Sequence, residues 1–447
     1  MILGKSARRA IGKEPAYPPG VGVVGNPMKD WLDAWDGRLR IPDVKTPSSL
    51  QRFDAARVVA LAWLLSASGT LAAETNTFFP LMAWNSAPSD AATFQKMREC
   101  GLTVAGFVSP KELDLCHAAG LQAIVSDPRV SNYDWRNVDE TAARKNIASL
   151  VAEVGKHPAV YGFYLRDEPG AEFFPGLAKV SALVRELAPG KWPYINLYPN
   201  YANAQQLGTA SYDEHLDKFI ATCKPTQLSY DHYALMDDGS LRPGYWQNLE
   251  AMRAAAKRHS LPFWNIVLTV AHFNYREPTA ADLRFQVYST LAYGGRGIAY
   301  FTYFAPQVGN YRAAPIDQFG HETPTWHHLQ NVNLQVRKLA PTLLQLTSDE
   351  VYHFGAVPEG CHAASEKSLV KSVNHSDLMC GDFTHADGSR YVLIVNKDFV
   401  KSHTCAPQFR SAPKRVQMVS PYTGQVTDFA GEQQWLAAGQ GVLLKVQ

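Results

Sequence analysis

Two adjacent carboxylates, Asp167 and Glu168, are the residues of this sequence best suited to acid–base chemistry. They end the apolar run 161–165 and precede Pro169, which cannot continue a strand ladder. Because an unpaired carboxylate is costly to bury, a strand that ends in two of them delivers them to a rim or a pocket. The charge of Asp167 is expected to raise the pKa of Glu168, which predicts Glu168 as a proton donor. The alternative is that the pair caps the next helix or binds Arg166.

Polar and aromatic residues also follow the other apolar runs of the chain. Aromatic faces stack on the apolar faces of sugar rings, and carboxylates and amides bind hydroxyl groups, so this mixture suits a carbohydrate. A phosphorylated ligand would call for clustered Arg and Lys or a glycine-rich loop, and neither is evident at these positions. The residues predicted to bind the carbohydrate are Trp84, Asn85, Asp127, Asp167, Asn196, Tyr198, His232, Tyr233, His272 and Tyr303.

Cleavage of a glycosidic bond needs a second carboxylate, which acts as a nucleophile or as a base. The candidates are Asp231, directly after an apolar run, and Glu277, several residues after the next one. Each also has a structural interpretation: Asp231 would orient His232 or Arg276, and Glu277 would only favour a helix dipole. A separation from Glu168 near 5 Å would predict a retaining mechanism, and about 6.5–9.5 Å an inverting one. The sequence leaves this choice open.

Eight apolar runs rich in β-branched and aromatic residues must position these side chains. Segments of helical periodicity separate the runs, and the one at 281–293 begins with a capping box at Thr279–Asp282. Eight such units over roughly 270 residues predict one (β/α)8 TIM barrel, whose strands end on one shared face. An open doubly wound sheet is the alternative, but no glycine-rich phosphate loop follows the first run. The runs are 78–84, 103–108, 122–126, 160–165, 192–197, 227–230, 263–269 and 297–302.

The remaining parts of the chain predict a three-part organisation. A helix near 324–346 closes the barrel of 74–347, and the long loop 305–322 after the eighth run is a candidate specificity loop. Short strands and turns then predict a small C-terminal antiparallel β-sandwich over 348–447. It is expected to pack against the barrel, with sugar binding as the alternative role.

The N-terminal extension, residues 1–73, contains a segment that resembles a secretory signal peptide. A basic flank at 52–57 precedes a short apolar stretch and a run of small residues. The stretch is too short to predict a membrane span, so we expect cleavage near Ala72 or Ala73 and a secreted or periplasmic protein. The alternative is a core helix. If the protein is exported, two of Cys361, Cys380 and Cys405 are candidates for a disulfide.

Composition narrows the range of partners. Apolar residues make up 46% and charged residues 19% of the 447, which is typical of a protein with a sizeable folded core. A net charge of +2 gives no indication of a nucleic-acid partner. The sequence has no CxxC and no HExxH motif, so we predict no metal and no other cofactor. A carbohydrate is the one partner predicted.

The order of the runs, the Asp167-Glu168-Pro169 ending of the fourth and the C-terminal β-domain resemble the clan A glycoside hydrolases, in particular β-galactosidase-like barrels and related secreted barrel proteins. The resemblance covers most of the chain after Ala73 and implies a glycoside hydrolase with Glu168 as acid/base. The clan usually has Asn where this chain has Asp167. Members of the clan also have a nucleophilic Glu at the end of the seventh strand. In this chain the nearest Glu, Glu277, follows the end of the seventh run by about eight residues.

That departure leaves a second hypothesis, a non-catalytic carbohydrate-binding barrel that has lost its second carboxylate. A metal-dependent hydrolase built on Asp127, His232 and His272 is a third and more distant one.

Overall fold

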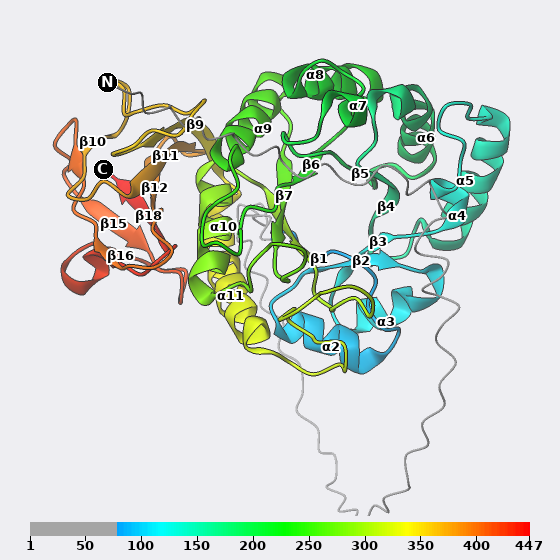
Figure 1. The fold of residues 1–447 in the computed structure, drawn as a ribbon, viewed down its shortest axis with the longest axis horizontal. Coiled ribbons are helices and arrows are strands. Elements are labelled where there is room, and N and C mark those ends of the chain that lie inside the picture. Colours follow the sequence, from blue (N-terminus) through cyan, green and yellow to red (C-terminus); the bar gives the residue numbers. More distant parts are fainter. Residues whose placement is uncertain (1–77) are drawn as a thin grey trace, which may run out of the picture. The chain divides into compact units, whose positions relative to one another are not determined.

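A parallel barrel is the central feature of the computed structural model, which describes residues 78–447 (Figure 1). The sheet order is β5-β4-β3-β2-β1-β8-β7-β6, and a parallel bridge between Leu197 and Tyr230 joins its two edges. This confirms the predicted TIM barrel over the open sheet. The predicted signal segment lies outside the described residues. The strands are β1 (Leu81–Ala83), β2 (Val104–Val108), β3 (Gln122–Val125), β4 (Val160–Asp167), β5 (Trp192–Asn196), β6 (Leu228–Asp231), β7 (Phe263–Leu268) and β8 (Gly297–Phe301).

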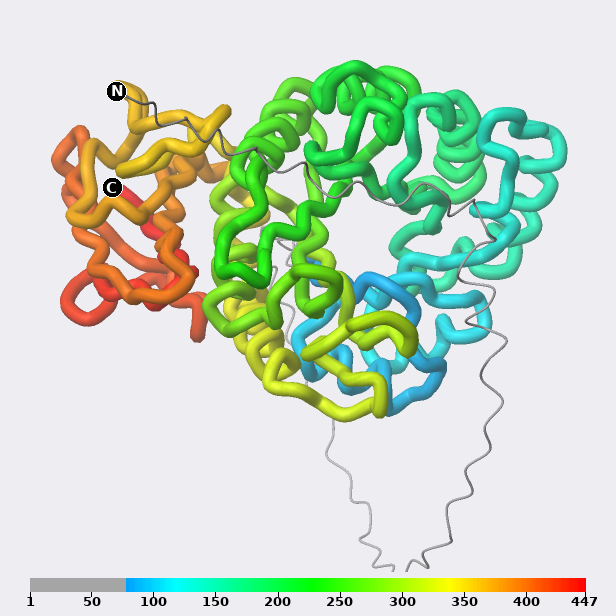
Figure 2. Tube along the Cα trace, in the orientation of Figure 1, coloured from blue at the N-terminus to red at the C-terminus, as the bar shows by residue number. Residues whose placement is uncertain are grey.

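Helices surround the barrel strands (Figure 2). The predicted capping box starts α10, because the Asp282 N–H donates to Thr279 Oγ1 over 3.2 Å and the Thr279 N–H donates to Asp282 Oδ2 over 3.0 Å. The helices are α2 (Ala91–Glu99), α3 (Leu113–Ala118), α4 (Pro128–Ser131), α5 (Glu140–Val154), α6 (Phe174–Leu187), α7 (Ala204–Leu207), α8 (Tyr212–Cys223), α9 (Tyr245–His259), α10 (Ala280–Ala292) and α11 (Pro324–Leu343), with 3-10 turns η1 (Pro110–Glu112), η2 (Ala171–Phe173) and η3 (Gly431–Gln434). No described helix is long and apolar enough to cross a membrane.

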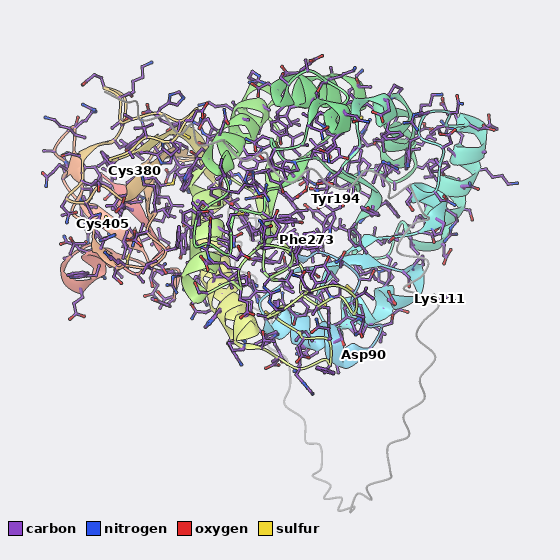
Figure 3. The ribbon with its side chains drawn as sticks, in the orientation of Figure 1. Asp90, Lys111, Tyr194, Phe273, Cys380 and Cys405 are labelled. Carbon is purple, nitrogen blue, oxygen red and sulfur yellow. The ribbon has the colours of Figure 1, made fainter. Side chains whose placement is uncertain are left out.

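Aromatic side chains fill the interior of the barrel. The Trp192 and Trp264 rings lie 4.8 Å apart, and Tyr194 contacts Trp84 at 5.7 Å between ring centroids. Figure 3 labels Tyr194 within the ring of strands and helices. These residues alternate along their strands with others that face the helices, as the period of two requires. The packed interior therefore closes the barrel below its mouth, and any ligand must bind above it.

The C-terminal part is antiparallel, as predicted. Its main sheet has the order β16-β15-β18-β12-β11-β9, and two pairs of short strands, β10 with β14 and β13 with β17, accompany it. The strands are β9 (Leu346–His353), β10 (Val370–Ser372), β11 (Leu378–His385), β12 (Arg390–Asn396), β13 (His403–Thr404), β14 (Gln408–Phe409), β15 (Val416–Val419), β16 (Val426–Asp428), β17 (Trp435–Leu436) and β18 (Gly441–Val446). All six cysteines are free, so no disulfide joins Cys361, Cys380 or Cys405.

Helix α10 packs against this β-domain through close backbone contacts. A Cβ on Gly381 would lie 2.1 Å from the Ala292 carbonyl oxygen, and one on Gly439 would lie 2.2 Å from the Ala281 carbonyl oxygen. Only glycine permits such an approach. The other face of α10 packs on β7, so most of its side chains, from Asp282 to Ala292, are buried.

Candidate active site

A single amide joins the two aspartates that end β4 and β6. The Asn196 Nδ2 group, at the end of β5, donates to Asp167 Oδ1 over 3.0 Å and to Asp231 Oδ1 over 2.8 Å. Its Oδ1 accepts from the Ser229 hydroxyl over 2.9 Å, which fixes the orientation of the amide. The two carboxylate oxygens therefore lie no more than about 6 Å apart. We call Asp167, Glu168 and Asp231 the carboxylate cluster.

A bulge in β4 is what turns Asp167 toward this amide. The register of β4 against β5 shifts between Tyr164 and Arg166, after which Asp167 pairs with Asn196. The Arg166 guanidinium lies instead over the Phe173 ring, 4.4 Å from its centroid. Bulges commonly redirect side chains beside active sites.

Glu168 follows the strand in a conformation that residues with a Cβ seldom adopt. Its φ is 41°, and its N–H donates to the Asn196 carbonyl oxygen over 2.9 Å. Among the described residues, no side chain forms a hydrogen bond with its carboxylate. Backbone strain of this kind costs about 1–3 kcal/mol and is concentrated at functional sites. Glu168 is thus held in place by its backbone and leaves its carboxyl group available.

Burial raises the pKa of all three carboxyl groups, and the charges of neighbouring carboxylates raise those of Glu168 and Asp231 further. Burial, followed by the charges of Asp231 and Asp167, raises the pKa of Glu168 to about 9. Burial and the charge of Asp167 raise the pKa of Asp231. Burial also raises the pKa of Asp167, but the Asn196 donor, the Arg166 charge and the Glu168 N–H oppose that shift. As the pH rises, Asp167 therefore ionises first, and its charge retains the protons on the other two.

Solvent access differs between the two aspartates. Asp167 is open to solvent at the barrel mouth, although protein atoms surround it on its other sides. Asp231 is only 4% exposed. The ionised carboxylate is thus the one that a ligand in the mouth would meet, and Asp231 lies behind it.

An aromatic wall stands beside the cluster. Tyr233 stacks on Phe301 with 5.1 Å between ring centroids, and His272 stacks on Tyr311 at 5.2 Å. Burial, then the charges of Asp231 and Asp167, raise the pKa of Tyr233, which places its hydroxyl group near the cluster. The structure thus brings the predicted residues Tyr233 and His272 to the site, together with Phe301 and Tyr311.

Phe273 extends this wall into solvent. Phe273 is 69% exposed, and Figure 3 labels it inside the ring of helices. Its φ of 46° is held by Asn310, whose Oδ1 accepts from the Phe273 N–H over 2.8 Å and whose Nδ2 donates to the Phe273 carbonyl oxygen over 3.1 Å. Phe273 is not predicted from the sequence, because nothing in the local pattern reveals its hydrogen bonds with Asn310.

Three other predicted residues lie at or under the mouth. Burial, then the charges of Glu168 and Asp167, raise the pKa of Tyr198 to about 12, so its hydroxyl group is close to the cluster. Trp84 is almost fully buried and contacts Phe107 edge-on at 4.7 Å between ring centroids, so it forms part of the floor. Asn85, with a φ of 77°, directs its Nδ2 toward Thr302 Oγ1 at 3.5 Å.

The structure places the remaining predicted residues with partners of their own. Asp127 caps α4 and forms an ion pair of 2.8 Å with Arg129. The Tyr303 hydroxyl group accepts from Trp326 Nε1 over 2.8 Å, which directs it toward α11. The His232 ring lies 3.0 Å from Asn248 Oδ1, measured from Nδ1. Asp127 and His232, two of the three residues proposed for a metal-dependent hydrolase, therefore interact with other side chains.

Glu277 stands apart from the carboxylate cluster. Its side chain is 60% exposed and lies 3.4 Å from the Arg312 guanidinium. It is also absent from the charges that raise the pKa of Glu168. The geometry therefore favours the cluster over Glu277 as the source of a second carboxylate.

Comparison with known proteins finds relatives in fold only. No protein-family model matches the sequence, and no curated protein matches it. A glycoside hydrolase family 5 structure from Bacteroides vulgatus has a TM-score of 0.53 and 13% identity, over 83% of this chain and 89% of that one. A GH42 beta-galactosidase from G. stearothermophilus, solved as a catalytic mutant, has a TM-score of 0.53 and 10% identity, over 83% and 98%.

The chain spans only 60% of the length of a beta-galactosidase from the psychrophilic Marinomonas ef1, which matches 58% of this chain with 12% identity and a TM-score of 0.47. At identities this low, the likeness to the first two structures establishes the barrel fold.

Proposed function

We propose that this chain is a glycoside hydrolase in which Glu168 protonates the leaving-group oxygen. The observation that carries the proposal is the Glu168 carboxyl group itself, whose pKa is raised to about 9 at the mouth of a β/α barrel. A carboxyl group that keeps its proton at neutral pH is what a general acid for this reaction requires. The aromatic wall of Tyr233, Phe301 and Phe273 supplies faces on which sugar rings stack.

The second carboxylate in this proposal is Asp167 rather than Asp231 or Glu277. Asp167 ionises first and is open to the mouth, whereas Asp231 is buried behind it and retains its proton. Asn196 and Arg166 stabilise the charged form of Asp167, so it can face the positive charge that develops at the anomeric carbon. Asp231 then acts as a positioning residue, because it holds the other N–H of the Asn196 amide.

The test is turnover by four proteins on a panel of aryl glycosides and oligosaccharides: wild type, Glu168→Gln, Asp167→Asn and the control Glu277→Gln. We expect Glu168→Gln to lose activity most severely on natural sugars, and less on aryl glycosides whose phenols leave without protonation. Asp167→Asn should lose activity on both kinds of substrate, and Glu277→Gln should resemble wild type. Equal losses on both kinds in Glu168→Gln would exclude it as the proton donor.

Absence of turnover by wild type, with sugar-dependent thermal shifts in every variant, would favour the carbohydrate-binding barrel. We also propose export of the protein, which rests on the signal-like sequence of 52–73 alone. N-terminal sequencing of the protein recovered from an exporting host tests it, since the expected first residue is near Glu74.

A further inference from the structure

Two histidines that are distant in sequence meet in the C-terminal β-domain. His375 lies in the loop before β11, and His403 begins β13. Their rings stack with 3.4 Å between centroids and an interplanar angle of 21°. The Asp377 carboxylate completes the group, and one ligand atom from each of the three residues lies within 4.8 Å of the others. Two imidazoles and a carboxylate are the donors that zinc and related divalent metals prefer.

A carboxylate orients one of the two rings. His403 Nε2 lies 3.1 Å from Asp398 Oδ2, which leaves the other ring nitrogen available. Asp398 is itself fixed, because its Oδ1 accepts the backbone N–H groups of Val400 and Lys401 over 2.7 and 2.9 Å. Histidine ligands of metals characteristically carry such a carboxylate on their second nitrogen.

The two segments are held together by a separate contact. Asn374 Oδ1 accepts the Ala406 N–H over 2.8 Å, and Asn374 Nδ2 donates to the Thr404 hydroxyl group. Asn374, next to His375, thus joins the loop before β11 to Thr404 and Ala406, which follow His403. These hydrogen bonds hold together the two backbone segments that carry the rings.

The local turn at His375 occurs a second time in the same domain, at His385. The Asp377 N–H donates to His375 Nδ1 over 3.2 Å, and in the same way the Asp387 N–H donates to His385 Nδ1 over 3.1 Å. The His-x-Asp turn therefore recurs without any second histidine at His385. Only the turn at His375 is met by another imidazole.

We propose that His375, His403 and Asp377 bind a divalent transition metal, with Zn²⁺ as the best match. The side chain of His375 is 33% exposed, that of His403 is 11% exposed and that of Asp377 is 52% exposed. Such a site is accessible from solvent and leaves a fourth position for water. The metal would fasten the loop before β11 to β13 and so stabilise the β-domain. The proposal does not depend on the glycosidase activity.

The test is calorimetric titration of the untagged, chelator-treated full chain with Zn²⁺, with thermal unfolding measured in parallel. We expect one Zn²⁺ per chain and a higher melting temperature for wild type and for the control His385→Ala. His375→Ala and His403→Ala should lose both effects, and Asp398→Asn should weaken binding by about 10- to 100-fold. A Co²⁺-loaded wild type should show the visible absorption of a tetrahedral site.

The proposal is overturned if wild type takes up no Zn²⁺. It is also overturned if His375→Ala and His403→Ala bind as tightly as wild type, or if His385→Ala weakens binding as much as they do. Circular dichroism of each variant confirms that a loss of binding is not a loss of fold.

Discussion

Substitution of Glu168 by Gln should stabilise the protein, and the gain should depend on pH. The pKa of Glu168 is raised from 4.5 to about 9 in the folded chain. Between these two values the native state binds a proton that the unfolded chain has released, so the free energy of unfolding falls as the pH rises. Glu168→Gln removes this dependence. It also breaks no side-chain hydrogen bond among the described residues, since none reaches the Glu168 carboxylate.

The size of the effect follows from the shift. At pH 8 the cost of ionising Glu168 in the folded chain, relative to the unfolded chain, is at most about 5 kcal/mol. This limit takes about 1.4 kcal/mol for each pH unit above 4.5. Glu168 is only partly buried, so solvent can hydrate its carboxylate, and the protons redistribute over the carboxylate cluster; we therefore expect about 2 kcal/mol. At pH 5 most of the penalty is absent, and the variant and wild type should differ by well under 1 kcal/mol.

Urea denaturation of the full chain at pH 5, 6, 7 and 8 measures this difference without any substrate. The control is Glu277→Gln, the same chemical change at an exposed position, which should give a small difference that is constant with pH. The reasoning is refuted if Glu168→Gln is no more stable than wild type at pH 8. It is also refuted if the gain is equal at pH 5 and pH 8, because burial and charge would then not explain it.

Three further predictions concern the site and the domain contact. Asn196→Ala removes a hydrogen-bond donor that lowers the pKa of Asp167. The ascending limb of the pH–rate profile should therefore move to higher pH by about 1 unit. A limb that does not move would contradict the role of Asp167. Phe273→Ala should raise KM by about 3- to 10-fold with little change in kcat, and Phe273→Tyr should restore it, because the exposed ring is expected to stack on a sugar. Gly381→Ala should lower the free energy of unfolding by about 1–3 kcal/mol in urea denaturation, since its Cβ would lie 2.1 Å from the Ala292 carbonyl oxygen; an unchanged midpoint would show that the contact relaxes freely.

The barrel was predictable because its strands carry long apolar runs and its helices carry caps. Parallel strands of a barrel end on one face, so the sequence alone could bring Asp167, Asn196 and Asp231 to the same mouth. The sequence could not decide which aspartate acts beside Glu168. That choice depends on the bulge in β4 that turns Asp167 toward Asn196 and on how deeply Asp231 is buried. A period of two does not reveal a one-residue shift in register.

Other parts of the site depend on partners that the sequence does not point to. Asp127 stands at a strand end like Asp167, yet Arg129 two residues later pairs with it. Phe273 needs Asn310 from a different loop to hold its backbone. His375 and His403 belong to no recognised ligand spacing, and only the folding of the β-domain brings them together.

Helix α10 lies between the core of the barrel and the core of the β-domain, so neither domain can be separated from the other without exposing it. Phe285 contacts Phe399 at 5.7 Å between ring centroids, and Arg284 donates to the Ala438 carbonyl oxygen over 2.9 Å, while the same helix supports β7 of the barrel. The outer face of α10 is therefore covered by the β-domain and not by solvent. A truncation after α11 would expose the apolar side chains on that face of α10 to water. We expect the barrel and the β-domain to melt in a single calorimetric transition. Transplanting either one onto another scaffold would require redesign of α10.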